Sequence, residues 1–171
     1  MAGVKLGDRL LVIGCADPRL IAQLAVKTGL TGRAFVVDED EPTVAAADRI
    51  ATQEGALIET AAAPWGRLPL PPDSFDVAVV RDVLAHLSAG DREACLSEVR
   101  RVLRPGGRCV VIDGKGRGRL TPVVRSGSGA SDYREADGPV RALTAQGLKP
   151  ARILAEREGL LFAEAFKPRG G

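Results

Sequence analysis

The sequence predicts an α/β protein built on a Rossmann-like doubly wound sheet of seven strands, mostly parallel, with one antiparallel strand in a C-terminal hairpin. Two observations support this fold class. Short continuous apolar runs alternate with segments of helical periodicity, as in sheets covered by helices on both faces. Near the end of the chain, two strand-like runs flank Arg157-Glu158-Gly159, which predicts a hairpin turn. The chain has 171 residues, so we expect a single domain over 1–171.

The first strand and helix have clear boundary signals. Leu10–Ile13 is a short apolar run, which is typical of a strand buried on both faces. Asp17 and Pro18 follow as a helix cap and a first-turn proline. Leu20, Ile21, Leu24 and Ala25 then recur at helical spacing, and Gly29 ends the helix.

The same alternation continues through the middle of the chain. A second helix is expected from Pro42 to Gly55, and Ser88 with Asp91 predicts the start of a third. This third helix is broken at Arg104-Pro105-Gly106-Gly107. The expected strands of this region are Ala34–Val37, Leu57-Ile58, Val77–Val80 and Cys109–Ile112.

The last third of the chain changes in texture. Residues 114–131 are rich in Gly, Ser and Arg, so we expect a flexible basic loop over about 114–135. A last helix at Pro139–Gln146 is followed by the hairpin strands Ala151–Ala155 and Leu160–Phe166. Ligands of such sheets bind beyond the carboxyl ends of the strands, which places the candidate site at the ends of the first five strands.

Composition excludes several classes. No apolar run approaches the roughly 20 residues of a membrane span. The first eight residues lack a signal-peptide layout, so we expect a cytoplasmic protein. Three scattered cysteines and one histidine support neither a disulfide framework nor a metal site. Residues 1–100 hold 10 Lys/Arg and 15 Asp/Glu, and residues 101–171 hold 14 and 7. This asymmetry is typical either of an anionic partner or of an ordinary solvated surface.

Three stretches carry a resemblance to a known family. These are LPLPPDSFDVAVVRDVLAHL (68–87), CLSEVRRVLRPGGRCVVID (95–113) and ALTAQGLKPARILAEREGLLFAEAFKP (142–168). In this order and spacing, they resemble the fourth strand, the helix with its Pro-Gly-Gly turn and fifth strand, and the closing hairpin of class I S-adenosylmethionine (SAM)-dependent methyltransferases. The resemblance is closest to the type 11 and ubiquinone/menaquinone biosynthesis methyltransferases. It implies SAM as the cofactor.

The resemblance assigns the donor loop to Gly14, Cys15 and Ala16. Glycines there let the backbone approach the ligand, and the following helix N-terminus favours an anion. This chain departs from the family pattern at three positions: Ala16 and Pro18 replace glycines, and Val12 replaces an acid. Asp17-Pro18 also has a purely structural explanation as a helix cap.

Further donor contacts are implied at the ends of the next two strands. Asp38 matches the acid that accepts the ribose hydroxyls, with Glu39 beside it; the alternative is loop solvation in the run 38–41. The adenine-facing acid of many relatives is absent after the third strand. Ala63 and Trp65 stand there instead, and Trp65 either lies against adenine or packs on the surface.

The acceptor side is expected at the end of the fourth strand. Arg81 is placed to line the methionine end of the pocket through its backbone, and Asp82 to cap the next turn. His86 is a candidate general base, with a structural role as the alternative. The basic residues from Lys115 to Arg125 form either an anion clamp or a solvated linker.

These features predict SAM-dependent methyl transfer to a small-molecule acceptor by in-line displacement, and the acceptor is anionic if the basic loop is an anion clamp. The alternative is a non-catalytic methyltransferase-like binding or scaffold subunit with a degenerate SAM pocket. Only about nine residues precede the first strand, whereas relatives carry N-terminal helices that cover SAM. We therefore expect the basic loop, a partner chain or a second copy to cover the cleft. Nucleic acid as a substrate is disfavoured, because the basic stretch from Lys115 to Arg125 has no aromatic residue for base stacking.

Overall fold

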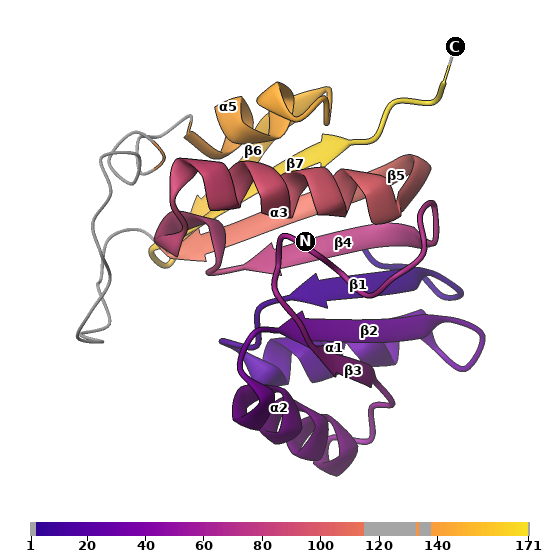
Figure 1. Ribbon diagram of the computed structural model, residues 1–171. Helices are drawn as coiled ribbons and strands as arrows, with labels where there is room; N and C mark the ends of the chain where they lie inside the picture. Colours follow the sequence, from indigo (N-terminus) through magenta and orange to yellow (C-terminus); the bar gives the residue numbers. More distant parts are fainter. Residues whose placement is uncertain (1–2, 115–132, 134–137, 171) are drawn as a thin grey trace.

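The computed structural model describes residues 3–114, 133 and 138–170, and their core is a seven-stranded sheet of order β3-β2-β1-β4-β5-β7-β6 (Figure 1). The strands are β1 (Arg9–Ile13), β2 (Arg33–Asp38), β3 (Glu59–Ala62), β4 (Phe75–Arg81), β5 (Leu103–Gly114), β6 (Ala151–Arg157) and β7 (Leu160–Phe166). The helices are α1 (Pro18–Thr28), α2 (Glu41–Gln53), the 3-10 turn η1 (Leu84–His86), α3 (Ala89–Val102) and α5 (Gly138–Ala145).

The predicted fold class is confirmed by the strand pairing. β3, β2, β1, β4 and β5 pair in parallel, whereas β7 pairs antiparallel with both β5 and β6. The order reverses between β1 and β4, so α1 and α3 leave the sheet on opposite faces. Ligands of open α/β sheets bind at this switch point, beyond the carboxyl ends of the two strands.

Two apolar clusters, one on each face, hold the helices to the sheet. Successive residues of β1 alternate between them: Leu10 and Val12 join the cluster of α1 and α2, and Leu11 and Ile13 join that of α3 and α5. All four side chains are almost completely buried. Burial on both faces is the reason that β1 is a continuous apolar run.

The predicted helix caps are present. The Asp17 side chain accepts a hydrogen bond from Leu20 N at 3.0 Å, and Ser88 Oγ accepts one from Asp91 N at 3.2 Å. The hairpin turn is also confirmed: Glu158 and Gly159 have φ of 52° and 76°, the left-handed conformation that tight hairpins need.

Several predicted boundaries are wrong. The third strand lies at Glu59–Ala62 rather than Leu57-Ile58, and Leu57 is 84% exposed because it belongs to the loop before the strand. Helix α2 begins at Glu41, since Asp40 and not Pro42 marks its start by capping Thr43 N. The turn at 104–107 lies within β5, which pairs with β4 from Leu103 onward.

Two further sequence predictions concern the basic loop and membrane-spanning segments. Most of the basic loop predicted over about 114–135 lies outside the described residues, at 115–132 and 134–135. Among the residues that the structure does describe, no helix is both long and apolar enough to cross a membrane.

Candidate donor-binding site

The turn after β1 is built around Gly14. Its N–H donates to Val37 O at 2.9 Å, and its φ is +92°, in the region that favours glycine. A Cβ at this position would overlap the carbonyl oxygen of Arg81 and lie 2.7 Å from Val83 Cγ2. Gly14 therefore allows the ends of β1, β2 and β4 to meet closely, which is where the sequence predicted the donor loop.

Asp38 connects the end of β2 to this turn. Its Oδ2 accepts a hydrogen bond from Cys15 N at 2.8 Å, and its Oδ1 accepts one from Asp40 N at 3.2 Å. A carboxylate has about four acceptor positions, so two remain for other donors such as hydroxyl groups. Asp38 thus organises the loop, a contact that the sequence did not predict, and keeps capacity to bind a ribose diol.

Cys15 lies inside the protein rather than in the cleft. Its side chain is 3% exposed and belongs to the core cluster of α1 and α2. Burial, together with the charge of Asp38, raises the pKa of its thiol to about 12, so the thiol is neutral and unreactive. Ala16, the next residue, is exposed, and a ligand can reach the backbone there.

A β-turn follows β3 at the position where the sequence predicted the adenine side. Arg67 N donates to Pro64 O at 2.9 Å, which places Trp65 at the second position of the turn. Trp65 N donates to Glu39 Oε1 at 3.3 Å, and Ala63 N donates to Asp38 O at 3.0 Å. Glu39 therefore positions the backbone of the turn from the end of β2.

The indole of Trp65 is half-buried against the core, but its Nε1 is buried without a hydrogen-bond partner. An unsatisfied buried donor costs free energy, on the order of 1–3 kcal/mol.

The end of β4 carries an ion pair. Arg81 Nη1 lies 3.2 Å from Asp82 Oδ2, without the alignment of a hydrogen bond, and the Arg81 side chain is 12% exposed. Asp82 Oδ1 accepts from Gly114 N at 2.7 Å, so Asp82 joins the ends of β4 and β5. The predicted capping role of Asp82 is wrong, because no side chain caps η1. His86 is exposed at the last position of η1.

Close to Arg81 and Asp82, whose charges act on Asp113, lies a buried polar group that the sequence did not predict. Tyr133 Oη donates to Asp113 Oδ2 at 2.6 Å, and the Arg92 guanidinium stacks on the Tyr133 ring at 4.2 Å. Burial raises the pKa of Asp113 to about 6 despite the Tyr133 hydrogen bond, and its Oδ1 has no partner. The only sequence signal was the position of Asp113 at the end of a buried strand.

A cavity of about 210 Å³ lies on the other side of Tyr133, between α3 and α5. It is mainly apolar, and Arg92 and Tyr133 are among the residues that line it. None of the predicted donor-site residues is among those that line it. This cavity is therefore separate from the predicted donor-site residues.

The strand order, with the Gly14 turn and Asp38 at its switch point, defines a Rossmann-like α/β protein of the methyltransferase topology. The sequence model of the methyltransferase domain family (type 11) matches residues 11–111. The chain belongs to this family. The matched region begins in β1 and ends in β5, so it contains every predicted donor-site residue.

Individual relatives agree with this assignment. The chain is 35% identical over 123 residues to the methyltransferase GfsG of Streptomyces halstedii, covering 71% of this chain and 43% of the relative. It is 31% identical over 112 residues to the ubiquinone/menaquinone biosynthesis C-methyltransferase UbiE of Bordetella parapertussis, covering 66% and 43%. The matched part thus spans less than half the length of these curated relatives.

A solved structure shares the fold. The crystal structure of a SAM-dependent methyltransferase from Aquifex aeolicus superposes with a TM-score of 0.79 at 20% identity, covering 96% of this chain and 85% of that one. At this identity the similarity establishes the fold alone.

Proposed function

We propose that this chain transfers a methyl group from SAM to a small-molecule acceptor by in-line displacement. The observation that carries the proposal is the hydrogen bond that joins Asp38 to the turn after Gly14. A glycine turn at the switch point of the sheet is held by a carboxylate that retains free acceptor positions. Bound SAM would supply the activated methyl group on its sulfonium.

The donor would be held along the three strand ends. The backbone at Gly14, Cys15 and Ala16 would approach the methionine part, with Arg81 at the end of β4. Asp38 would accept from the ribose hydroxyls, and Ala63 and Trp65 would flank adenine. The hydrogen bonds from Ala63 N to Asp38 O and from Trp65 N to Glu39 support this placement, because they hold the turn beside the proposed ribose contact.

Methyl transfer requires little from the protein beyond alignment of the nucleophile with the methyl group. A base is needed only if the acceptor loses a proton. His86 is exposed at the carboxyl edge of β4 and remains the candidate base for such an acceptor. A small-molecule acceptor is supported by the UbiE relatives, which are C-methyltransferases of ubiquinone and menaquinone biosynthesis. A cytoplasmic location and a covering partner chain belong to the same proposal.

The test is calorimetric titration of the purified chain with SAM and, separately, with S-adenosylhomocysteine. We expect saturable binding that Asp38→Ala abolishes and that Asp48→Ala, an exposed carboxylate of α2, leaves unchanged. Absence of heat with both ligands at millimolar concentration would contradict the proposal and favour a binding or scaffold role. Binding that Asp38→Ala leaves intact would contradict the assignment of Asp38.

A further inference from the structure

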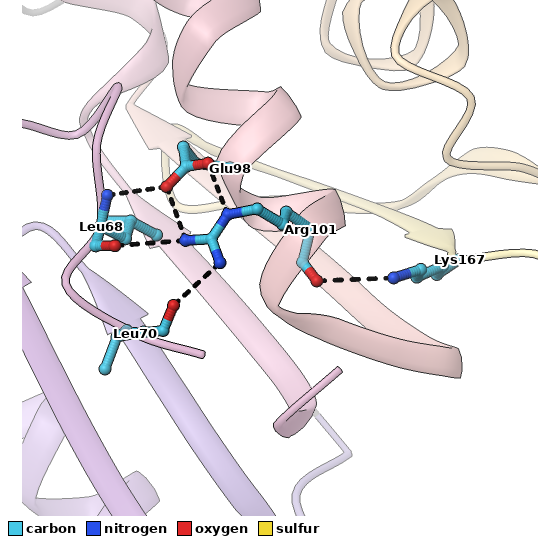
Figure 2. A network of polar contacts seen from close by, with 5 residues as sticks. All are labelled: Leu68, Leu70, Glu98, Arg101 and Lys167. Atoms are coloured by element: carbon cyan, nitrogen blue, oxygen red, sulfur yellow. Dashed lines mark hydrogen bonds and ion pairs between the residues drawn. The ribbon is translucent and has the colours of Figure 1, made fainter. Parts of the chain in front are cut away.

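The Trp65 turn continues into a segment that is anchored to α3 by two charged residues (Figure 2). Glu98 Oε2 accepts a hydrogen bond from Leu68 N at 2.8 Å. Arg101 donates to Leu68 O at 3.2 Å and to Leu70 O at 2.9 Å. The backbone of Leu68 is therefore held through both its N–H and its carbonyl, three residues after Trp65.

Glu98 and Arg101 also hold each other. Arg101 Nε lies 2.7 Å from Glu98 Oε1, and Nη2 lies 2.8 Å from Oε2. This two-point geometry is the strong, directional form of the arginine–carboxylate interaction. The hydrogen bonds from Arg101 hold the pKa of Glu98 below its ordinary value. The pair is therefore ionised and rigid, with every Arg101 nitrogen directed at a defined partner.

The other end of the turn is fixed as well. Ala63 is bound to Asp38 O, and Trp65 N to Glu39, both at the end of β2. Within the turn, a Cβ on Gly66 would lie 3.2 Å from Ala94 Cβ, so the turn packs closely on α3. Along the chain, Trp65 thus lies between hydrogen bonds to the end of β2 and hydrogen bonds to α3. Removing either anchor frees the turn to move relative to the end of the sheet.

We propose that Glu98 and Arg101 are positioning residues: by fixing Leu68 and Leu70, they set the place of the Trp65 indole and, through it, the affinity for the nucleoside part of the cofactor. The nucleoside half of this inference rests on the function proposed above. The positioning half does not, because it concerns the ligand-free protein. Because the pair binds the loop backbone at three atoms, it fixes this segment relative to α3.

The experiment uses Trp65 as its own probe, since it is the only tryptophan in the chain. Emission of the full chain is recorded without ligand, with acrylamide as quencher, and during titration with S-adenosylhomocysteine. The variants are Arg101→Ala and, as a matched control, Arg104→Ala. Arg104 lies three residues further along and pairs with Asp76, without contact to the Trp65 turn.

We expect Arg101→Ala to increase acrylamide quenching of Trp65 and to weaken S-adenosylhomocysteine binding about tenfold, as for loss of charged hydrogen bonds. Arg104→Ala should change neither. Glu98→Gln, which keeps the shape of the side chain, is the second variant if Arg101→Ala does not fold, and should weaken binding severalfold. Emission, quenching and affinity equal to wild type in a folded variant would overturn the inference, even with a lower melting temperature.

Failure of the proposed function gives a different result. If wild-type emission and heat do not respond to S-adenosylhomocysteine, the methyltransferase proposal and the nucleoside half of this inference are both overturned. Quenching of the ligand-free variants then decides the positioning half by itself.

Discussion

Asp38 Oδ2 accepts a hydrogen bond of 2.8 Å from the backbone N–H of Cys15, which joins the end of β2 to the turn after β1. The two residues are 23 positions apart in sequence, so the contact exists only once the strands have paired in register. It gives one carboxylate two tasks, organisation of the loop and a candidate contact to the donor ribose. The two tasks can be separated by substitution.

Asp38→Asn retains an oxygen for the Cys15 N–H but loses the charge and one strong acceptor. We expect it to weaken S-adenosylhomocysteine binding about tenfold or more, with a change in unfolding free energy below about 1 kcal/mol. Asp38→Ala loses both tasks and should cost about 1–3 kcal/mol in addition to binding. Urea unfolding and calorimetry measure the two effects. Equal stability of both variants would show that the Cys15 contact contributes nothing.

Gly14→Ala places a methyl group against the Arg81 carbonyl in a left-handed conformation. We expect a loss of at least about 2 kcal/mol in stability, with loss of cofactor binding, because strain and overlap add. Gly90→Ala is the control: nothing lies within 4 Å of its Cβ position, and alanine favours the helix α3 by up to about 1 kcal/mol. Chemical denaturation compares them. A neutral Gly14→Ala would contradict the close packing of these strand ends.

The buried carboxyl group of Asp113 leads to a prediction for the pH dependence of folding stability. Burial raises its pKa from the ordinary 3.8 to about 6, so the folded state holds the proton more tightly than the unfolded chain. The stability from this group is fully present below pH 3.8 and is lost as the pH rises through about 6. Asp113→Asn should therefore gain stability relative to wild type between pH 4 and pH 8, by roughly 1–3 kcal/mol. Thermal melts at both pH values test this.

The control for that measurement is Asp48→Asn, which alters an exposed carboxylate. Its difference from wild type should be the same at both pH values. A pH-independent difference for Asp113→Asn as well would show that the Asp113 carboxyl is not held protonated by its surroundings.

The thiols of the three cysteines should be unreactive in the native protein. Cys15, Cys95 and Cys109 are all buried, and burial raises the thiol pKa of each, to about 12 for the first two. Since the thiolate is the reactive form, we expect no rapid reaction with an aromatic disulfide reagent at pH 8 and three equivalents after unfolding. Fast labelling of one native thiol would show that the structure opens locally at that cysteine.

The sequence predicted much of the architecture because local signals there agree with the fold. The apolar run Leu10–Ile13 could only be a strand buried on both faces, and Asp17 and Ser88 cap helices through residues three positions away. The prediction of a strand at Leu57-Ile58 was wrong because a two-residue apolar run has no periodicity. The true strand, Glu59–Ala62, lies at the sheet edge and needs little apolar burial.

The candidate site likewise contains residues that local sequence signals identify and contacts that only the tertiary structure shows. Gly14, Asp38 and the family resemblance could be found in the sequence, because the end of a strand and the demand for a left-handed residue are local properties. The partners of Asp38, Trp65 and Asp113 could not. The contacts Cys15–Asp38, Glu39–Trp65, Leu68–Glu98 and Asp113–Tyr133 join residues 20 to 30 positions apart. Such hydrogen bonds depend on angstrom-scale distances set by sheet register and helix packing, which no local pattern of residues encodes.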